Sequence, residues 1–283
     1  MRRFLLLYPI FVCLFVLLSL PANVVAQSET PQTQPSTIFI PLITRTVTYP
    51  PLSSNWLERV NAYRARAGVP PVTESNDLNS NCWQHARYMA ENNHLTHNQD
   101  STKPYASPEG QICAARGNAW LGGGNFWQPA DAIDGWMQSV GHRLWLLYPT
   151  TPTFGFGFYI TPSGTTSAAG LDVLSYFNNG DNYPAWPVRY PGIDQTDVPA
   201  TQYPITLQWR YFGSTPVISS TDLRVVGGNV IPHTSTTNLP VGHKGIAVTP
   251  TVNLPANSLI EVSISGSYDG QPFTYTWQFR TGN

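Results

Sequence analysis

The histidines are the side chains in this sequence best suited to chemistry, because a neutral imidazole can bind a metal or move a proton. Four of the six histidines fall between positions 85 and 142. His94 and His97 are three residues apart and could share a metal, although histidines at a helix end are more often solvated surface groups. His97 and His142 each come shortly after a predicted helix. We therefore expect both to point into one cleft.

Ser139, three residues before His142, forms the only local combination of serine and histidine. Three residues across a helix end do not by themselves give the geometry of a catalytic triad. The sequence also contains no Gly-x-Ser-x-Gly turn and no His-Glu-x-x-His helix. These observations leave enzymatic activity uncertain and favour a non-catalytic role.

The sequence contains three cysteines, and two of them are expected in the mature chain. Cys13 lies in the apolar run of a predicted signal peptide and should be removed with it. Cys82 and Cys113 are then an even pair in an exported protein, where thiols oxidise. One disulfide between them is the favoured interpretation, and two buried free thiols are the alternative.

The first 26 residues have the pattern of a secretory signal peptide. Arg2 and Arg3 form a basic start, residues 4–20 form an apolar run, and Ala26 ends a small-residue cleavage site. An uncleaved membrane anchor is the alternative, since the run nearly reaches the length of a span. We expect a secreted, extracellular protein with no membrane span after cleavage.

Composition excludes several classes of protein. The chain has 283 residues, of which 12% are aromatic and only 11% charged, so it is neither disordered nor a coiled coil. Its formal net charge is −1 and it has no long basic run. A nucleic-acid partner is therefore not expected.

Hydrophobic periodicity predicts helices in the region that carries most of the histidines. Helices are expected from about residue 55 to 67, from 77 to 93, and from Pro129 onward, with a short turn over 142–148. Residues 95–128 are rich in Gly and Pro and are expected to be irregular. Residues 154–158 alternate like a strand, with 171–176 as the expected hairpin partner. This region is therefore expected to be α+β.

The sequence predicts two domains joined by a linker. Residues 27–52 are predicted to be a linker, residues 53–182 the first domain, and residues 183–196 a Pro-rich linker. In residues 197–283 the helical period disappears and six short alternating segments remain, as in an antiparallel β-sandwich. The final strands loosely resemble bacterial immunoglobulin-like repeats, so an all-β immunoglobulin-like sandwich is expected there. His233 and His243 are expected in its turns.

Several motifs of the first domain occur in the order found in one known family. They are Asn61 and Arg64 before Gly68-Val69-Pro70-Pro71, then Leu95-Thr96-His97, then Trp136-Met137-x-Ser139-x-Gly141-His142-Arg143, then Phe154-Gly155-Phe156-Gly157. Over residues 54–178 the chain resembles the bacterial branch of the CAP superfamily, with its cysteine-rich secretory (SCP-like), antigen five and pathogenesis-related proteins. The resemblance implies a three-layer α/β/α sandwich with an open cleft.

The resemblance also implies a ligand set for this cleft. In the family two histidines and two acidic residues line the cleft, and the histidines can hold zinc. His97 and His142 match these histidines. Glu109 is the candidate for the first acidic residue, although it is displaced by one residue from the glutamate of the family's Gly-Glu-Asn-Ile motif. Ser139 stands at the position of the second acidic residue. Two imidazoles are half of a tetrahedral zinc site, so the ion would be weakly bound and exchangeable.

Three functions fit these expectations. The favoured one is a non-catalytic binding or adhesion protein of the cell exterior, whose extracellular ligand could be a protein, peptide, glycan or lipid. The second is a zinc-assisted, peptidase-like hydrolase in which Glu109 is a general base toward zinc-bound water. The third is a lipid- or sterol-binding protein, which requires an apolar groove in the first domain.

Overall fold

The computed structural model of the chain describes residues 49–283. The predicted signal peptide, and the predicted linker up to residue 48, lie outside the described residues. Within residues 49–283, no helix has the length and apolar character that crossing a bilayer requires.

Helices α1 (Trp56–Arg66) and α2 (Asn76–Glu91) confirm the first two predicted helices. Each begins where a polar side chain accepts hydrogen bonds from first-turn amides, which have no partner inside the helix. Asn55 Oδ1 accepts from the amides of Leu57 and Glu58 at 2.9 and 3.1 Å. Ser75 caps α2 in the same way. These local signals explain why the two helices could be predicted from the sequence.

The expectation that residues 95–128 are irregular is wrong for their second half. This stretch contains α3 (Pro108–Ala115) and the strand β2 (Gly117–Gly123). Strand β2 pairs along its whole length with β4 (Thr166–Asp172). Its glycines and single tryptophan carry no strand period of their own, so a partner about 50 residues away determines its conformation.

A four-stranded sheet forms the centre of this region. Its order is β1-β3-β4-β2, with β1 (Thr73–Glu74) parallel to β3 (Thr153–Ile160) and the other pairs antiparallel. The predicted first strand is present as β3 and does pair with a following antiparallel strand, but the predicted position of that second strand is wrong. The second strand was expected over 171–176, but β4 ends at Asp172 because that side chain accepts hydrogen bonds from Leu174 N and Ser175 N and turns the backbone.

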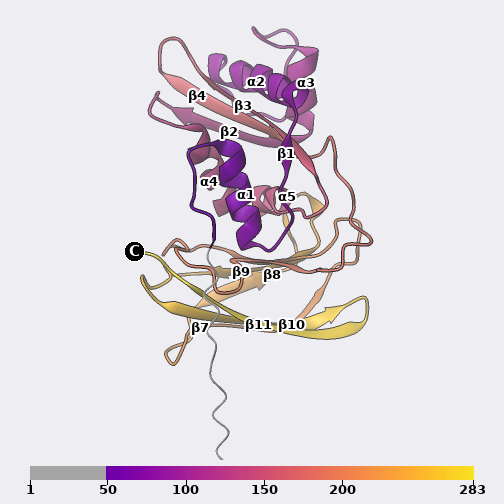
Figure 1. Cartoon of the computed structure of the whole chain (residues 1–283), viewed down its shortest axis with the longest axis vertical. Coiled ribbons are helices and arrows are strands. Elements are labelled where there is room, and N and C mark those ends of the chain that lie inside the picture. The colour runs from indigo at the N-terminus through magenta and orange to yellow at the C-terminus, as the bar shows by residue number, and fades with distance from the viewer. Residues whose placement is uncertain (1–48) are drawn as a thin grey trace, which may run out of the picture. The chain divides into compact units, whose positions relative to one another are not determined.

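Helices cover both faces of this sheet, as Figure 1 shows: α2 and α3 lie on one face and α1 and α4 (Pro129–Gln138) on the other. Helix α2 approaches β3 very closely. A Cβ atom at Gly157 would lie 2.0 Å from the backbone nitrogen of Trp83, so only glycine fits there. The Phe-Gly-Phe-Gly pattern thus combines large residues that pack on α1 and α4 with small ones that admit α2.

Residues 142–148, expected to be a turn, mostly belong to a further short helix, α5 (Val140–Leu146). The helix is anchored by Arg143, whose Nε donates to Met137 O at 2.7 Å and whose Nη1 donates to Pro204 O. The guanidinium is fully buried and also lies over the rings of Tyr190 and Tyr203. The local sequence does not predict these contacts, because the partners lie far away along the chain.

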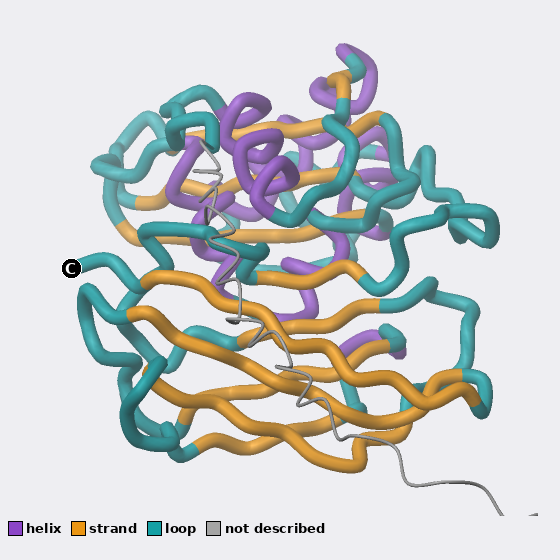
Figure 2. The backbone as a smooth tube through the Cα atoms, turned by 60° about the horizontal axis from the view of Figure 1, so that its bottom comes forward, coloured by secondary structure: helices purple, strands orange, loops and turns teal. Residues whose placement is uncertain are grey.

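The last third of the described chain forms two antiparallel sheets (Figures 1 and 2). One has the order β5-β6-β9-β8, from β5 (Val188–Tyr190), β6 (Ile205–Gln208), β9 (Gly245–Pro250) and β8 (His233–Thr236). The other has the order β11-β10-β7, from β11 (Gln271–Arg280), β10 (Leu259–Tyr268) and β7 (Val217–Val225). All-β structure is therefore present in this part, while an immunoglobulin-like fold stays a prediction.

Two local expectations for this part need correction. Strand β5 falls within residues 183–196, which were expected to be a linker, because it pairs with β6 and so continues the sheet. His233 was expected in a turn but is the first residue of β8, where it pairs with Pro250 of β9. His243 does lie in a turn, directly after the 3₁₀ helix η1 (Pro240–Gly242).

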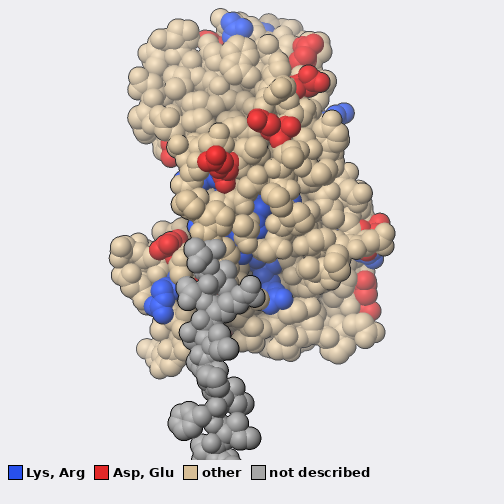
Figure 3. Space-filling view, viewed as in Figure 1, with Lys and Arg blue, Asp and Glu red and all other residues tan. Residues whose placement is uncertain are grey.

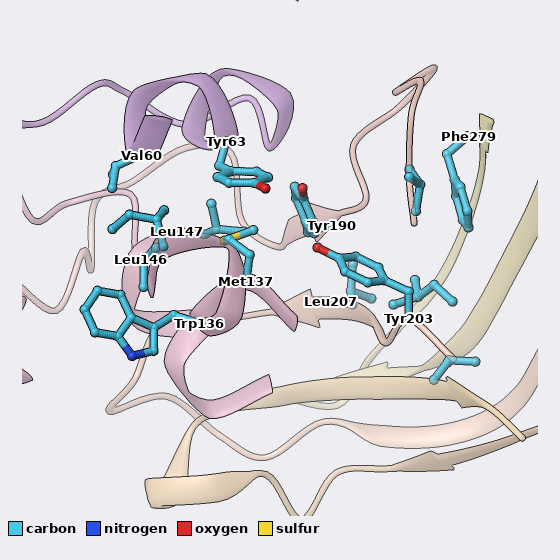
Figure 4. Packing of buried hydrophobic residues seen from close by; sticks show 14 of the residues in the cluster. Val60, Tyr63, Trp136, Met137, Leu146, Leu147, Tyr190, Tyr203, Leu207 and Phe279 are labelled. Atoms are coloured by element: carbon cyan, nitrogen blue, oxygen red, sulfur yellow. The ribbon is translucent and has the colours of Figure 1, made fainter. Parts of the chain in front are cut away.

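One buried hydrophobic cluster contains residues from both sides of the predicted domain boundary. Figure 4 shows Tyr63, Met137 and Leu146 together with Tyr190 and Tyr203 of the following segment. Hydrogen bonds also cross the boundary, since Gln208 Nε2 donates to Leu144 O at 3.0 Å. The predicted domain boundaries stay predictions. A test of them must take into account that these contacts are lost when the chain is cut.

Candidate binding groove

A groove of about 620 Å³ lies over the C-terminal end of α3, the start of β2 and the α4–α5 junction. Its lining is mostly apolar, with His97, His142, Asn118 and Ser139 as the polar side chains. The remaining lining residues are Ala114, Ala115, Gly117, Val140, Gly141, Trp145, Val173, Leu174, Tyr211, Pro240 and Val241. The structure thus places both predicted histidines and Ser139 around one groove.

His142 is held in a defined orientation by the residue that caps its helix. Its Nδ1 lies 2.6 Å from Ser139 Oγ, and Ser139 Oγ can donate to Trp136 O at 3.4 Å. In the tautomer in which Nδ1–H of His142 donates to Ser139 Oγ, the serine proton is directed to Trp136 O and Nε2 keeps its lone pair for a ligand or a metal ion. Ser139 therefore acts here as a positioning residue for His142.

The electrostatics of the groove keep His142 neutral. Burial, and secondarily the nearby His97, lower the pKa of His142 below its ordinary value of 6.5. His97 is exposed, so it lies at the rim of the groove while His142 is half-buried. A neutral imidazole is the form that binds a divalent ion.

Asn118 is a groove residue that the sequence did not reveal. It is 2% exposed, and its Nδ2 donates to His142 O at 3.3 Å. Its Oδ1 has no hydrogen-bond partner among residues 49–283. A buried carbonyl oxygen without a partner favours a ligand that brings an O–H or N–H donor. No signal pointed to it, because its strand lies in the stretch expected to be irregular.

Glu109 does not line the groove. It lies in the first turn of α3 and is exposed, whereas the groove is lined by Ala114 and Ala115 at the other end of this helix. No other carboxylate is among the lining residues. Within residues 49–283 there is also no group of three or more His, Cys, Asp and Glu arranged to hold a metal. Among histidine, cysteine and carboxylate side chains, the groove lining therefore offers a metal only the two imidazoles.

The other two histidines of the first domain have different surroundings. His94 is exposed and is not among the lining residues. His85 is buried, with Nε2 3.0 Å from Thr96 O and Nδ1 3.2 Å from Gln99 Nε2. Burial lowers the pKa of His85 to about 4. His85 thus holds the segment that leads to His97.

The disulfide fixes the helix that forms one wall of the groove. Cys82 of α2 and Cys113 of α3 are bonded, which confirms the predicted pairing. Cys113 directly precedes Ala114 and Ala115 in the lining. The bond therefore ties this wall to α2, which packs on the central sheet.

The opposite wall comes from the β-rich part of the chain. Tyr211 follows β6, and its hydroxyl donates to Val241 O at 2.6 Å. Val241 has a φ of +52°, which is strained for a β-branched residue, and is 65% exposed. The two parts of the chain thus build one groove together, a feature that the sequence analysis did not anticipate.

Part of the chain matches a known protein family. Residues 57–177 match the family described as CAP, the cysteine-rich secretory protein family. No curated protein matches the chain. An extracellular protein of Bacillus anthracis that contains an SCP domain is similar over 41% of this chain and 38% of its own length, at 19% identity and a TM-score of 0.31. An outer surface protein of Borrelia burgdorferi is similar over 41% of this chain and 86% of its own, at 14% identity and a TM-score of 0.31.

Proposed function

We propose that this chain is a non-catalytic binding protein of the cell exterior, and that its ligand occupies the groove around His97 and His142. The observation that carries the proposal is the lining itself, which is mostly apolar, contains no carboxylate, lysine or arginine, and brings His97, His142, Asn118 and Ser139 together. Pockets of this kind bind small or extended ligands that are mostly uncharged. The predicted signal peptide and the secretory family match support the location.

The same lining argues against hydrolysis. A hydrolase of the predicted kind needs a general base about 3 Å from the attacking water. Glu109 is exposed outside the groove, and no other carboxylate is among the lining residues. We therefore expect a broad peptide panel to show no turnover with or without added zinc.

The imidazoles of His97 and His142 can serve as ligands of a divalent ion, which would bind weakly and exchange readily. Zn²⁺ titrated into the purified chain by calorimetry should bind at one site, and His142→Ala or His97→Ala should abolish this binding. His94→Ala, an exposed histidine outside the lining, is the matched control, and Glu109→Gln should also leave the affinity unchanged. Equal zinc affinity in the His97/His142 double variant would show that the groove histidines hold no metal.

The metal site should weaken as the pH falls, because protons compete for the imidazoles. Since burial lowers the pKa of His142, its contribution should persist somewhat below pH 6.5. Removing the Ser139 hydroxyl with Ser139→Ala should free the ring to rotate and weaken zinc binding without abolishing it. The expected loss is about tenfold or more, the usual effect of removing such a partner.

The apolar walls support a second candidate ligand, a lipid with a hydroxyl or amide head. Such a head could donate to Asn118 Oδ1 while its chain lies along Val173, Leu174 and Val241. Trp145 lines the groove, so its fluorescence should change when a fatty alcohol or fatty amide binds. Asn118→Ala should reduce that binding more than the binding of a saturated hydrocarbon.

A further inference from the structure

A second cavity, of about 650 Å³, shares no residue with the groove around the histidines. We call it the proline pocket. Two segments before β3 form one side and the segment between β4 and β5 forms the other. It is lined by Pro70, Pro71, Pro149, Thr150, Thr151, Pro152, Asn178, Gly180, Asp181, Asn182, Tyr183 and Pro184.

Three side chains of the proline pocket have polar groups free to bind a ligand. Neither the Asn182 amide nor the Tyr183 hydroxyl makes a hydrogen bond with another part of residues 49–283, and Asn178 uses only its Oδ1, which accepts from Gly180 N at 2.9 Å. Together they offer amide N–H donors, an amide carbonyl acceptor and a phenol hydroxyl. A ligand rich in groups that both donate and accept matches this set.

The pocket carries almost no net charge. Its single charged lining residue is Asp181, and Oδ1 of Asp181 accepts from Arg210 Nη1 at 2.8 Å. The chain as a whole is poor in charge, and Figure 3 shows few charged side chains on the face that it draws. An ionic ligand would therefore find no strong complementary partner in this pocket, and a neutral ligand is favoured.

The walls of the pocket are rigid before any ligand binds. Five of its lining residues are prolines, whose rings fix the backbone angle φ and present flat apolar surfaces. The loop opposite is held by Trp186 Nε1, which donates to Gly180 O at 2.9 Å, and by Thr150 Oγ1, which donates to Asn178 O. A site that is already ordered loses less entropy when it binds.

From these features we propose that the proline pocket binds a neutral saccharide. A pyranose ring has hydroxyls around its edge, each both donor and acceptor, and patches of C–H groups on its faces. The hydroxyls match the Asn178, Asn182 and Tyr183 groups, and the C–H faces match the proline rings and the Tyr183 ring. The pocket volume also lies within the range of small-ligand sites. This site is independent of the function proposed for the groove.

The test uses the purified full chain and calorimetric titration with four neutral tetrasaccharides, namely cellotetraose, xylotetraose, mannotetraose and chitotetraose. At least one should bind, and tetragalacturonate, which is acidic, should bind more weakly. Asn182→Ala and Tyr183→Phe should each weaken the affinity about three- to tenfold, the effect of one lost hydrogen bond. Asn76→Ala, an exposed asparagine on α2, and His142→Ala in the groove should leave it unchanged.

Three results would overturn the proposal. They are the absence of binding by all four neutral sugars at 20 mM, equal affinity for sugar in Asn182→Ala and the unmodified chain, and tighter binding of tetragalacturonate than of any neutral sugar. Circular dichroism of each variant shows whether a loss reflects unfolding. Tyr183→Phe retains the ring and so tests the hydroxyl even if larger substitutions disturb the loop.

Discussion

Stability should depend on pH through His243, a residue that packs against the wall of the groove. Its ring is 2% exposed and lies 4.2 Å from the Trp145 ring, centroid to centroid. Its nitrogens have no hydrogen-bond partner of normal geometry among residues 49–283. Burial lowers the pKa of His243 from 6.5 to about 4, against a smaller opposing contribution from the backbone of Gly141.

The sign and size of the effect follow from these two pKa values. Between pH 6.5 and about 4 the unfolded chain binds a proton at this position and the folded chain does not, so stability falls as the pH falls through this window. Each unit of pKa difference corresponds to about 1.4 kcal/mol, which gives roughly 3 kcal/mol over the full window and about 2 kcal/mol between pH 7 and pH 5.

Replacing His243 with Phe removes the titration but keeps an aromatic ring against Trp145 and Tyr211. Urea unfolding at pH 7 and pH 5, followed by tryptophan fluorescence, should show a loss of stability on acidification that is smaller in His243→Phe by about 2 kcal/mol. The control His94→Gln replaces an exposed histidine and should keep the full loss. An identical loss in His243→Phe and the unmodified chain would refute the assignment of a buried, neutral His243.

Three more predictions concern stability. Replacing both Cys82 and Cys113 with Ala opens a loop with a sequence separation of 31 residues. The free energy of unfolding, measured in urea, should fall by roughly 3 to 4 kcal/mol in the loop-entropy model. A free thiol detected by mass spectrometry in the unmodified, unfolded chain would contradict the pairing. Arg143→Ala should lower the free energy of unfolding by about 3 kcal/mol or more, because it empties a buried volume and leaves the carbonyls of Met137 and Pro204 without their donor. An unchanged thermal unfolding temperature would count against this role of Arg143. A fragment of residues 27–196 should be soluble, and because Arg143 and Leu144 lose partners beyond residue 196, it should unfold at a lower urea concentration than the full chain. Aggregation of the fragment alone would place the boundary elsewhere.

Local signals in the sequence were sufficient for several features of this protein. Helices α1, α2 and α4 have apolar residues at helical spacing, and they begin at an Asn cap, a Ser cap and a proline, so local energetics and burial agree there. The disulfide followed from an even pair of cysteines in a chain with a predicted export signal. The likeness of residues 54–178 to the CAP family followed from motifs in a fixed order, and a family match over 57–177 supports it.

The remaining features depend on contacts between residues far apart in the sequence. Strand β2 and helix α5 have weak patterns of their own, and they form because β4 and Pro204 supply their partners. The groove is built by α3, β2 and α5 together with Tyr211 and Val241 from beyond the predicted boundary, so no local pattern could list its lining. His97 and His142 could be predicted because each follows a helix, whereas Asn118 could not, and the turns of the folded chain leave Glu109 on the surface. Where residue types and periods are strong they predict helices and strands, but weakly patterned elements and the direction in which each side chain points depend on how the elements pack.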